Sequence, residues 1–318
     1  MINRRDLFWN AATTAMLGAT FPASAKAAAK AMVTECPATA GIVPAQTSWE
    51  LPPPQDKSFA GYVDVGDATL YYRDMGVDGP PVLFLHPATG CVLSWAFQEP
   101  AFAKAGLRMI SYSRRTHYGS RSDGETGPDK DFSDLERFAD KLKLDRFHLV
   151  GIAAGGFQVA QYALKHPARL HSLSIICSLG GISDPAFQAT TAAMLAGGMR
   201  NMPEYMRELG PSFRAASPEG VAAWNAIEHV ARNEEGANRG PRRSFQFLGW
   251  DDLEKIKTPA LLGTGEADMY MPPSRLRQFA SHMPHAEQVV FSESGHAPFW
   301  EQPMAFNRVM IDFLSRHG

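Results

Sequence analysis

The sequence predicts an α/β protein with a mostly parallel eight-stranded sheet, helices on both faces and a helical cap inserted late in the chain. Two observations support this. From residue 59 onward, short apolar runs alternate with segments of helical periodicity, whereas residues 183–247 contain no strand-like run. The 318 residues are 45% hydrophobic, which is ample for a packed core. This composition excludes a disordered or fibrous chain.

The first two predicted strands alternate around Gly66-Asp67, which indicates an antiparallel hairpin. The third, Pro81-Val82-Leu83-Phe84-Leu85, is apolar throughout, as expected of a strand that is buried on both faces. The eight predicted strands are residues 61–65, 68–72, 81–85, 108–113, 147–150, 172–177, 260–263 and 287–291.

Helical periods separate these strands. Apolar residues recur at spacings of three and four near residues 135–142, 159–164 and 306–314. We therefore divide the folded part into a core, residues 59–182 and 248–318, and a helical cap, residues 183–247. The cap is rich in methionine, and its methionines either line an adaptable pocket or pack the cap against the core.

The N-terminal residues 1–25 are typical of an export signal. Arg4-Arg5 precedes an uncharged stretch up to Phe21, and Ala23-Ser24-Ala25 offers a small-residue cleavage site. The segment resembles a twin-arginine signal, so we expect a periplasmic or secreted protein. The alternative is an uncleaved anchor, but the stretch is short for a membrane span. Residues 26–57, rich in alanine and proline, predict a surface arm packed in part through Trp49 and Leu51.

Charge and cysteine content narrow the range of partners. The formal net charge is −2, which gives no electrostatic argument for a nucleic acid partner or, once the signal is cleaved, for an anionic membrane. Three scattered cysteines do not make a disulfide framework or a Cys-x-x-Cys metal site. No dinucleotide or P-loop motif occurs, and we expect neither cofactor nor metal. The expected partner is a small molecule, and the sequence does not indicate an oligomeric state.

One turn carries most of the chemical information. The strand ending at Ile152 runs through Gly151-Ile152-Ala153-Ala154-Gly155 into a helix. This sharp strand-to-helix turn resembles the Gly-x-Ser-x-Gly nucleophile elbow, with Ala153 at the serine position. From about Phe59 to the C-terminus the chain resembles the α/β-hydrolase fold superfamily, in which the serine works with an acid and a histidine.

The resemblance implies further site residues in the family's order. It implies that the loop Leu85-His86-Pro87-Ala88 contributes the Ala88 backbone N–H to an oxyanion hole, with Ala154 as its partner. It maps the acid to Asp268 and the base to His296, within Ser294-Gly295-His296. Further residues near these motifs are candidates for substrate binding: His86, Thr89, His117, Tyr118 and Trp300.

Ala153 leaves three explanations open, since a methyl group cannot attack a carbonyl. The alanine replaces a serine as an engineered knock-out, or the protein is a natural enzyme in which Asp268 and His296 activate water, or it is a periplasmic ligand-binding protein on the same fold. Among other nucleophiles, Cys91 is the most interesting, and Cys177 is expected to be buried. The leading expectation is hydrolysis of a small apolar ester, lactone or activated carbonyl compound, including C–C cleavage beside a carbonyl.

Overall fold

A computed structural model describes residues 41–122, 126–232 and 248–318. The predicted export signal, Cys36 and the first part of the arm lie outside the described residues. None of the helices in the described part combines the length and apolar character that crossing a bilayer requires.

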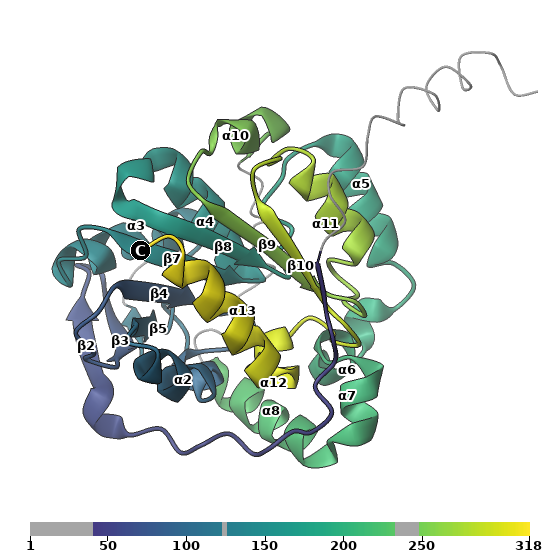
Figure 1. The fold of residues 1–318 in the computed structure, drawn as a ribbon, viewed down its shortest axis with the longest axis horizontal. Helices are drawn as coiled ribbons and strands as arrows, with labels where there is room; N and C mark the ends of the chain where they lie inside the picture. Colours follow the sequence, from purple (N-terminus) through teal and green to yellow (C-terminus); the bar gives the residue numbers. More distant parts are fainter. Residues whose placement is uncertain (1–40, 123–125, 233–247) are drawn as a thin grey trace, which may run out of the picture. The chain divides into compact units, whose positions relative to one another are not determined.

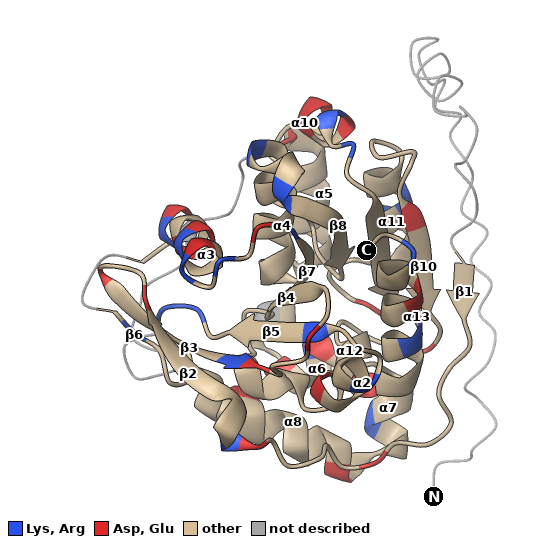
Figure 2. Ribbon diagram, turned by 60° about the vertical axis from the view of Figure 1, so that its left-hand side comes forward, with Lys and Arg blue, Asp and Glu red and all other residues tan. Residues whose placement is uncertain are grey.

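The described strands form one sheet, mostly parallel, that contains all eight predicted strands. Its order is β1-β10-β9-β8-β7-β4-β5-β3-β2, with β6 paired to β3 (Figures 1 and 2). The predicted hairpin is antiparallel, Val63 opposite Leu70. The bounds are β1 Gly41–Val43, β2 Ala60–Asp64, β3 Ala68–Asp74, β4 Pro81–Leu85, β5 Arg108–Tyr112, β6 Arg121–Ser122, β7 Phe147–Ile152, β8 Leu170–Ile176, β9 Ala260–Gly265 and β10 Glu287–Phe291.

Helices cover both faces of the sheet. Its central strands β4, β7, β8 and β9 contain no Asp, Glu, Lys or Arg, and in Figure 2 the charges lie mainly on helices and loops. The alternation along β4 explains the two layers: Leu83 packs with α3 (Pro128–Lys141), α4 (Ala154–Lys165) and α11 (Pro273–Ala280). Phe84 packs on the opposite face with α2 (Gln98–Lys104) and α13 (Pro303–Ser315).

Two short strands, β1 and β6, extend the predicted sheet. β1 lies in the predicted arm and pairs parallel to β10, Ile42 opposite Val290. An edge strand offers unpaired backbone groups, so three residues without a strand-like pattern can be recruited by pairing alone. Beyond β1, the Trp49 ring packs against Trp300, 5.8 Å between centroids, and its Nε1–H donates to the Trp300 carbonyl at 2.8 Å. Leu51, in contrast, is exposed.

Between β8 and β9 the described chain is helical, and we call residues 183–247 the insertion. It carries α5 Pro185–Met194, η4 Met199–Asn201, α6 Glu204–Glu208, α7 Pro211–Ala216 and α8 Pro218–Ala231, and α10 Trp250–Lys255 follows it. The remaining short helices are η1 Lys57–Phe59, η2 Val92–Trp95, η3 Pro167–Arg169 and α12 Pro298–Glu301.

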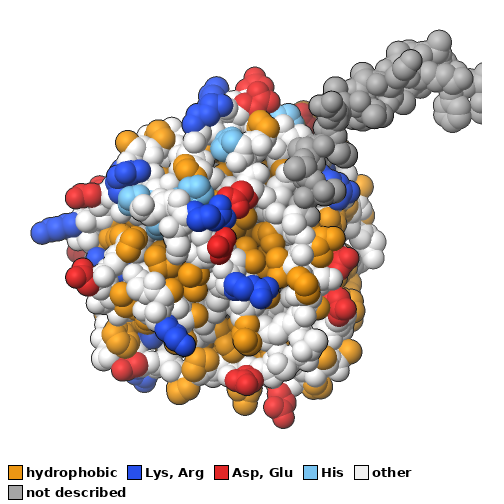
Figure 3. Space-filling model, in the orientation of Figure 1, with side chains coloured by type: hydrophobic (Ala, Val, Ile, Leu, Met, Phe, Trp, Pro, Cys, Tyr) orange, Lys and Arg blue, Asp and Glu red, His pale blue; other side chains and the backbone are white. Residues whose placement is uncertain are grey.

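The surface charges are mixed. On the face shown in Figure 3, basic and acidic side chains are interspersed and apolar side chains lie between them. Neither sign gathers into a continuous field on that face.

Candidate active site

The chain turns sharply at Ala153, between β7 and α4. Ala153 has φ 49° and ψ −111°, a conformation that side chains with a Cβ rarely adopt. Its N–H donates to the Ile176 carbonyl at 2.9 Å, which fixes the turn to β8. Such backbone strain costs about 1–3 kcal/mol and is found mostly at functional sites. The elbow is therefore retained even though its apex is alanine.

Glycine allows the elbow to pack tightly. A Cβ on Gly155 would lie 2.3 Å from the Leu85 carbonyl oxygen, and one on Gly151 would lie 2.6 Å from the Gly155 backbone. Both contacts are too short for real atoms. The two glycines thus bring the first turn of α4 against the end of β4, where the loop with Ala88 begins.

A histidine–aspartate pair is buried beside the elbow. His296 Nδ1 lies 2.8 Å from Asp268 Oδ2, so the proton on Nδ1 is donated to the carboxylate. Asp268 also accepts the N–H groups of Tyr270 at 2.8 Å and Met271 at 3.0 Å. Burial raises the pKa of Asp268, but the His296 charge and these bonds outweigh it, so the pKa is lowered and Asp268 is ionised.

The other ring nitrogen of His296 is open to a cavity of about 270 Å³. No described group bonds Nε2, and Nε2 is not among the buried atoms without a partner, so it is accessible. Burial lowers the pKa of His296, but Asp268 raises it more, and the net shift is upward. The cavity is lined by Ala88, Thr89, Ala153, Ala154, Phe157, Cys177, Ser178, Leu179, Glu204, Arg207, Glu208, Arg232, Tyr270 and His296.

Two backbone N–H groups in this cavity are available to a ligand. Neither Ala88 nor Ala154 donates its N–H to any described group. Ala154 is the first residue of α4, whose N-terminal dipole favours negative charge. A pair of such donors near a base can stabilise an oxyanion.

An arginine holds the loop that carries Ala88. The Arg114 guanidinium donates to the His86 carbonyl at 2.9 Å and to the Pro87 carbonyl at 3.0 Å. The Arg114 N–H donates to His86 Nε2 at 3.0 Å. His117 Nε2 lies 3.3 Å from the Ala88 carbonyl oxygen. These contacts orient the peptide that presents the Ala88 N–H.

A buried carboxyl, Glu301, holds the loop that carries His296. It accepts the N–H groups of Gly295 at 2.9 Å and Ala297 at 3.2 Å, on either side of the histidine. It also accepts the Gly210 N–H from the insertion at 2.8 Å. Burial raises the pKa of Glu301 to about 7 in spite of these three donors. This side chain therefore joins the insertion to the histidine loop.

A second buried carboxyl, Glu208, is in the cavity itself and was not predicted. It ends α6, and its Oε2 accepts the Thr89 hydroxyl at 2.7 Å. Its backbone carbonyl accepts the His296 N–H at 2.6 Å. Burial raises the pKa of Glu208 to about 7, although His296 and Thr89 lower it. No local motif marks this glutamate, because only the docking of α6 brings it to the histidine.

The structure brings together six of the predicted site residues and separates four from them. Ala153, Ala154, Ala88, His296 and Thr89 line the cavity, and Asp268 bonds the histidine. The side chains of the other four do not line it, which corrects their expected role in substrate binding: His86, His117, Tyr118 and Trp300.

Packing explains these four positions. The His86 and His117 rings contact each other in a tilted arrangement, 4.7 Å between centroids, and Tyr118 packs on Tyr71 at 5.7 Å. Trp300 is buried in an aromatic cluster, where its Nε1–H donates to the Gly220 carbonyl at 3.2 Å. None of the insertion's described methionines lines the cavity either, and its wall there is polar: Glu204, Arg207 and Glu208.

Neither described cysteine is placed to replace the serine. Burial raises the pKa of Cys91 to about 12, and this residue does not line the cavity. Cys177 does line the cavity, but it is fully buried and burial raises the pKa of its thiol far above the usual range. Both thiols are therefore protonated. The ligand atoms of Cys177, Asp268 and His296 lie within 4.8 Å of one another, but the Asp268–His296 hydrogen bond already occupies two of them.

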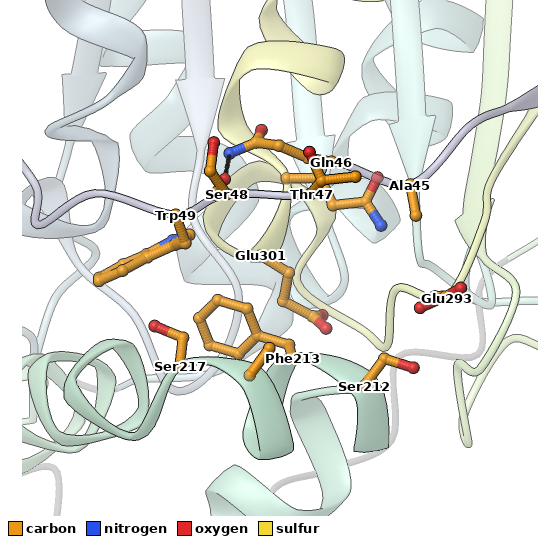
Figure 4. Close-up of a pocket in the computed structure, with 12 residues that line it drawn as sticks. Ala45, Gln46, Thr47, Ser48, Trp49, Ser212, Phe213, Ser217, Glu293 and Glu301 are labelled. Atoms are coloured by element: carbon orange, nitrogen blue, oxygen red, sulfur yellow. Dashed lines mark hydrogen bonds between the residues drawn. The ribbon is translucent and has the colours of Figure 1, made fainter.

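A second cavity is lined by neither His296 nor Ala153. It has about 290 Å³ and is lined by residues 45–49 of the arm, by α7, and by Glu293, Glu301 and Gln302. Figure 4 shows the Glu301 carboxyl between Trp49, Phe213 and Glu293. We place the chemistry in the first cavity, because of these two it is the one that joins the elbow, the base and the N–H groups of Ala88 and Ala154.

Comparison with known proteins identifies the family. The model of the alpha/beta hydrolase family matches residues 82–309. This chain belongs to the alpha/beta hydrolase family, as the resemblance of its motifs predicted, and the sheet and flanking helices confirm the predicted fold class.

Its relatives are mostly hydrolases. A 2-hydroxy-6-oxononadienedioate/2-hydroxy-6-oxononatrienedioate hydrolase of Paraburkholderia phymatum is 27% identical over 263 residues, 78% of this chain and 91% of that protein. The non-heme chloroperoxidase CPO-A1 of Kitasatospora aureofaciens is 27% identical, over 78% of this chain and 96% of its own. The structure of Est816, an N-acyl homoserine lactone degrading enzyme, matches with a TM-score of 0.65 and 26% identity, covering 80% of this chain and 100% of that chain. These relatives support a general hydrolase activity.

Proposed function

We propose that this protein hydrolyses a small ester, lactone or activated carbonyl compound by activating water directly. The observation that carries the proposal is the accessible Nε2 of His296 in the same cavity as two N–H groups, of Ala88 and Ala154, that no described group accepts, with Ala153 at the elbow. A general base contributes about 10²–10⁴ in rate, and each oxyanion donor about 10²–10³.

The mechanism uses groups that line the cavity, together with Asp268 behind the histidine. Water gives a proton to His296 Nε2 and attacks the carbonyl carbon, while Asp268 stabilises the imidazolium. The carbonyl oxygen becomes negative and is held by the N–H groups of Ala88 and Ala154. The leaving group then takes the proton from His296, so no covalent enzyme intermediate forms.

The cavity lining suggests the shape of the substrate. One part is apolar, with Ala153, Phe157 and Leu179, and the part from the insertion is charged, with Glu204 and Arg207. A small molecule with an apolar body and one polar end fits both. The related 2-hydroxy-6-oxononadienedioate/2-hydroxy-6-oxononatrienedioate hydrolase makes oxo acids of this kind worth assaying as substrates.

Turnover of 4-nitrophenyl acetate by three proteins tests the proposal. We expect the native chain to be active, His296→Ala to lose at least about 10²-fold, and Ala153→Ser to gain activity with a burst of acyl-enzyme. Activity in Ala153→Ser alone would show that the chain is a disabled serine hydrolase. If all three are silent and a ligand binds tightly, the protein is a ligand-binding protein instead.

We also propose export to the periplasm or the medium, on the basis of Arg4, Arg5 and the apolar stretch that follows. Replacing both arginines by lysine keeps the charge but removes the twin-arginine pair. We expect the native chain in the periplasmic fraction and the double variant in the cytoplasm at its uncleaved length. Equal export of both would rule out the twin-arginine route.

A further inference from the structure

Besides the base and the two oxyanion donors, the described lining of the cavity carries the Cys177 thiol, hydroxyls of Thr89, Ser178 and Tyr270, and the carboxyls of Glu204 and Glu208. Thr89 is already bonded to Glu208. Hydrolysis makes use of the base and the donors, yet it gives Glu208 no task.

The position of Glu208 is specific. Its side chain reaches Thr89, the residue after Ala88, so its carboxyl lies next to one oxyanion donor. Its backbone carbonyl accepts the His296 N–H, which holds the end of α6 against the residue that carries the base. Oε1 has no partner among the described groups, and it is not among the buried atoms without one, so it is accessible. Since Glu208 lines the cavity, Oε1 is open to a bound molecule.

We propose that this site also catalyses proton transfer between carbons near a carbonyl group, with His296 as the base and Glu208 as the proton donor. The proposal shares the histidine and the backbone donors with the proposed hydrolysis, but it needs neither water nor a bond to cleave. Its substrate class is a small ketone or ester with an acidic C–H, best a β,γ-unsaturated one.

Every atom in the step is accounted for. His296 Nε2 takes a proton from the carbon next to the carbonyl, and the electron pair moves onto the carbonyl oxygen between the N–H groups of Ala88 and Ala154. In a β,γ-unsaturated ketone the negative charge spreads to the γ carbon. The Glu208 carboxyl gives its proton to that carbon, so the double bond moves into conjugation. The proton on His296 then passes through solvent to the Glu208 carboxylate, which restores both groups to their starting protonation states.

The surroundings of Glu208 keep it able to donate near neutral pH. Glu204, on the same helix, disfavours its charge, and Arg207 and His296 favour it. Arg207 is itself paired with Glu204 and bonded to the Tyr270 hydroxyl at 2.9 Å. Burial is the largest influence on the pKa of Glu208 and opposes ionisation.

Two ketones separate the two steps. Cyclohexanone cannot be hydrolysed or isomerised, so deuterium uptake in D₂O, followed by proton NMR, reports the action of His296 alone. 3-Cyclohexenone becomes 2-cyclohexenone, which absorbs in the ultraviolet, and reports transfer by both groups. We expect the native full-length chain to exceed the buffer rate in both assays.

Variants of His296 and Glu208 test which group carries out each step. His296→Gln is expected to abolish both reactions. Glu208→Gln keeps an acceptor for Thr89 and should retain deuterium exchange, which also shows that its site is folded, while isomerisation falls at least about 10-fold. Glu219→Gln, an exposed carboxylate on α8 of the same insertion, is the matched control and should change neither rate.

The outcomes distinguish this proposal from hydrolysis. No exchange above the buffer rate overturns it, and if the same preparation cleaves 4-nitrophenyl acetate the proposed hydrolysis still stands. Exchange without ester cleavage removes the hydrolysis and supports proton transfer. Isomerisation that persists in Glu208→Gln overturns the role of Glu208.

Discussion

At the scale of single residues, the protonation of His296 controls either reaction. A base must be neutral at Nε2, and the charge and hydrogen bond of Asp268 raise the pKa of His296 above its usual 6.5 despite burial. The inactive imidazolium therefore persists to a higher pH than it would in a free histidine. The same pairing keeps the proton on Nδ1, so that Nε2 faces the cavity.

The rate should follow this titration. We predict that kcat/KM for 4-nitrophenyl acetate falls as the pH decreases, with an apparent pKa above 6.5. Asp268→Asn should move this limb to lower pH and reduce kcat by about 10²–10⁴-fold, because the tautomer and the imidazolium lose their support. The exposed Asp251→Asn serves as the control. If the apparent pKa of the pH–rate profile were unchanged in Asp268→Asn, the result would contradict the pairing of Asp268 with His296.

At the scale of the elements, the site is assembled where several chain segments end. The elbow joins β7 to α4, Asp268 follows β9 and His296 follows β10. These three strands have their carboxyl ends at one edge of a parallel sheet, which is where such folds bind ligands. The insertion adds α6, and Glu301 ties its Gly210 to the histidine loop.

Removing the Glu301 carboxyl should disturb both the insertion and the histidine loop. Glu301→Ala leaves three buried N–H groups without their acceptor, and each such loss costs about 1–3 kcal/mol. We predict a lower unfolding free energy in urea and a fall in kcat, because the histidine loop moves. Glu301→Gln keeps one acceptor oxygen and should lie between Glu301→Ala and the native chain. Glu293→Ala, exposed in the same loop, should change little.

At the scale of the whole molecule, the two buried carboxyls couple folding to pH. Glu208 and Glu301 have a pKa of about 7 in the folded protein, against an ordinary 4.5. Between pH 4.5 and 7 the folded state binds more protons than the unfolded state. The contribution of these two glutamates to stability is therefore present below pH 4.5 and is lost as the pH rises through about 7.

A variant isolates the contribution of Glu208. Glutamine cannot ionise, so Glu208→Gln should gain stability relative to the native chain as the pH rises from 5 to 8, by about 1–3 kcal/mol at 1.36 kcal/mol for each pKa unit. Urea unfolding at each pH measures the difference. A flat difference, like that expected for Glu219→Gln, would show that folding does not raise the pKa of Glu208.

Local sequence patterns were sufficient to predict much of the fold of this protein. The order of strands and helices could be predicted because buried strands are continuous apolar runs and helices repeat every three to four residues. The resemblance to the α/β-hydrolase family pointed to Asp268, His296 and the alanine elbow, because the motifs that carry it are short and contiguous.

Only the tertiary structure decided which side chains share the cavity. Glu208 and Thr89 are far apart in the chain, and no spacing rule joins them, since the docking of α6 onto the histidine loop sets their contact. His86, His117 and Trp300 come from informative motifs but are used for packing. Strand β1 likewise depends on the free edge of β10, because pairing with a distant strand can impose a conformation that local residues do not specify.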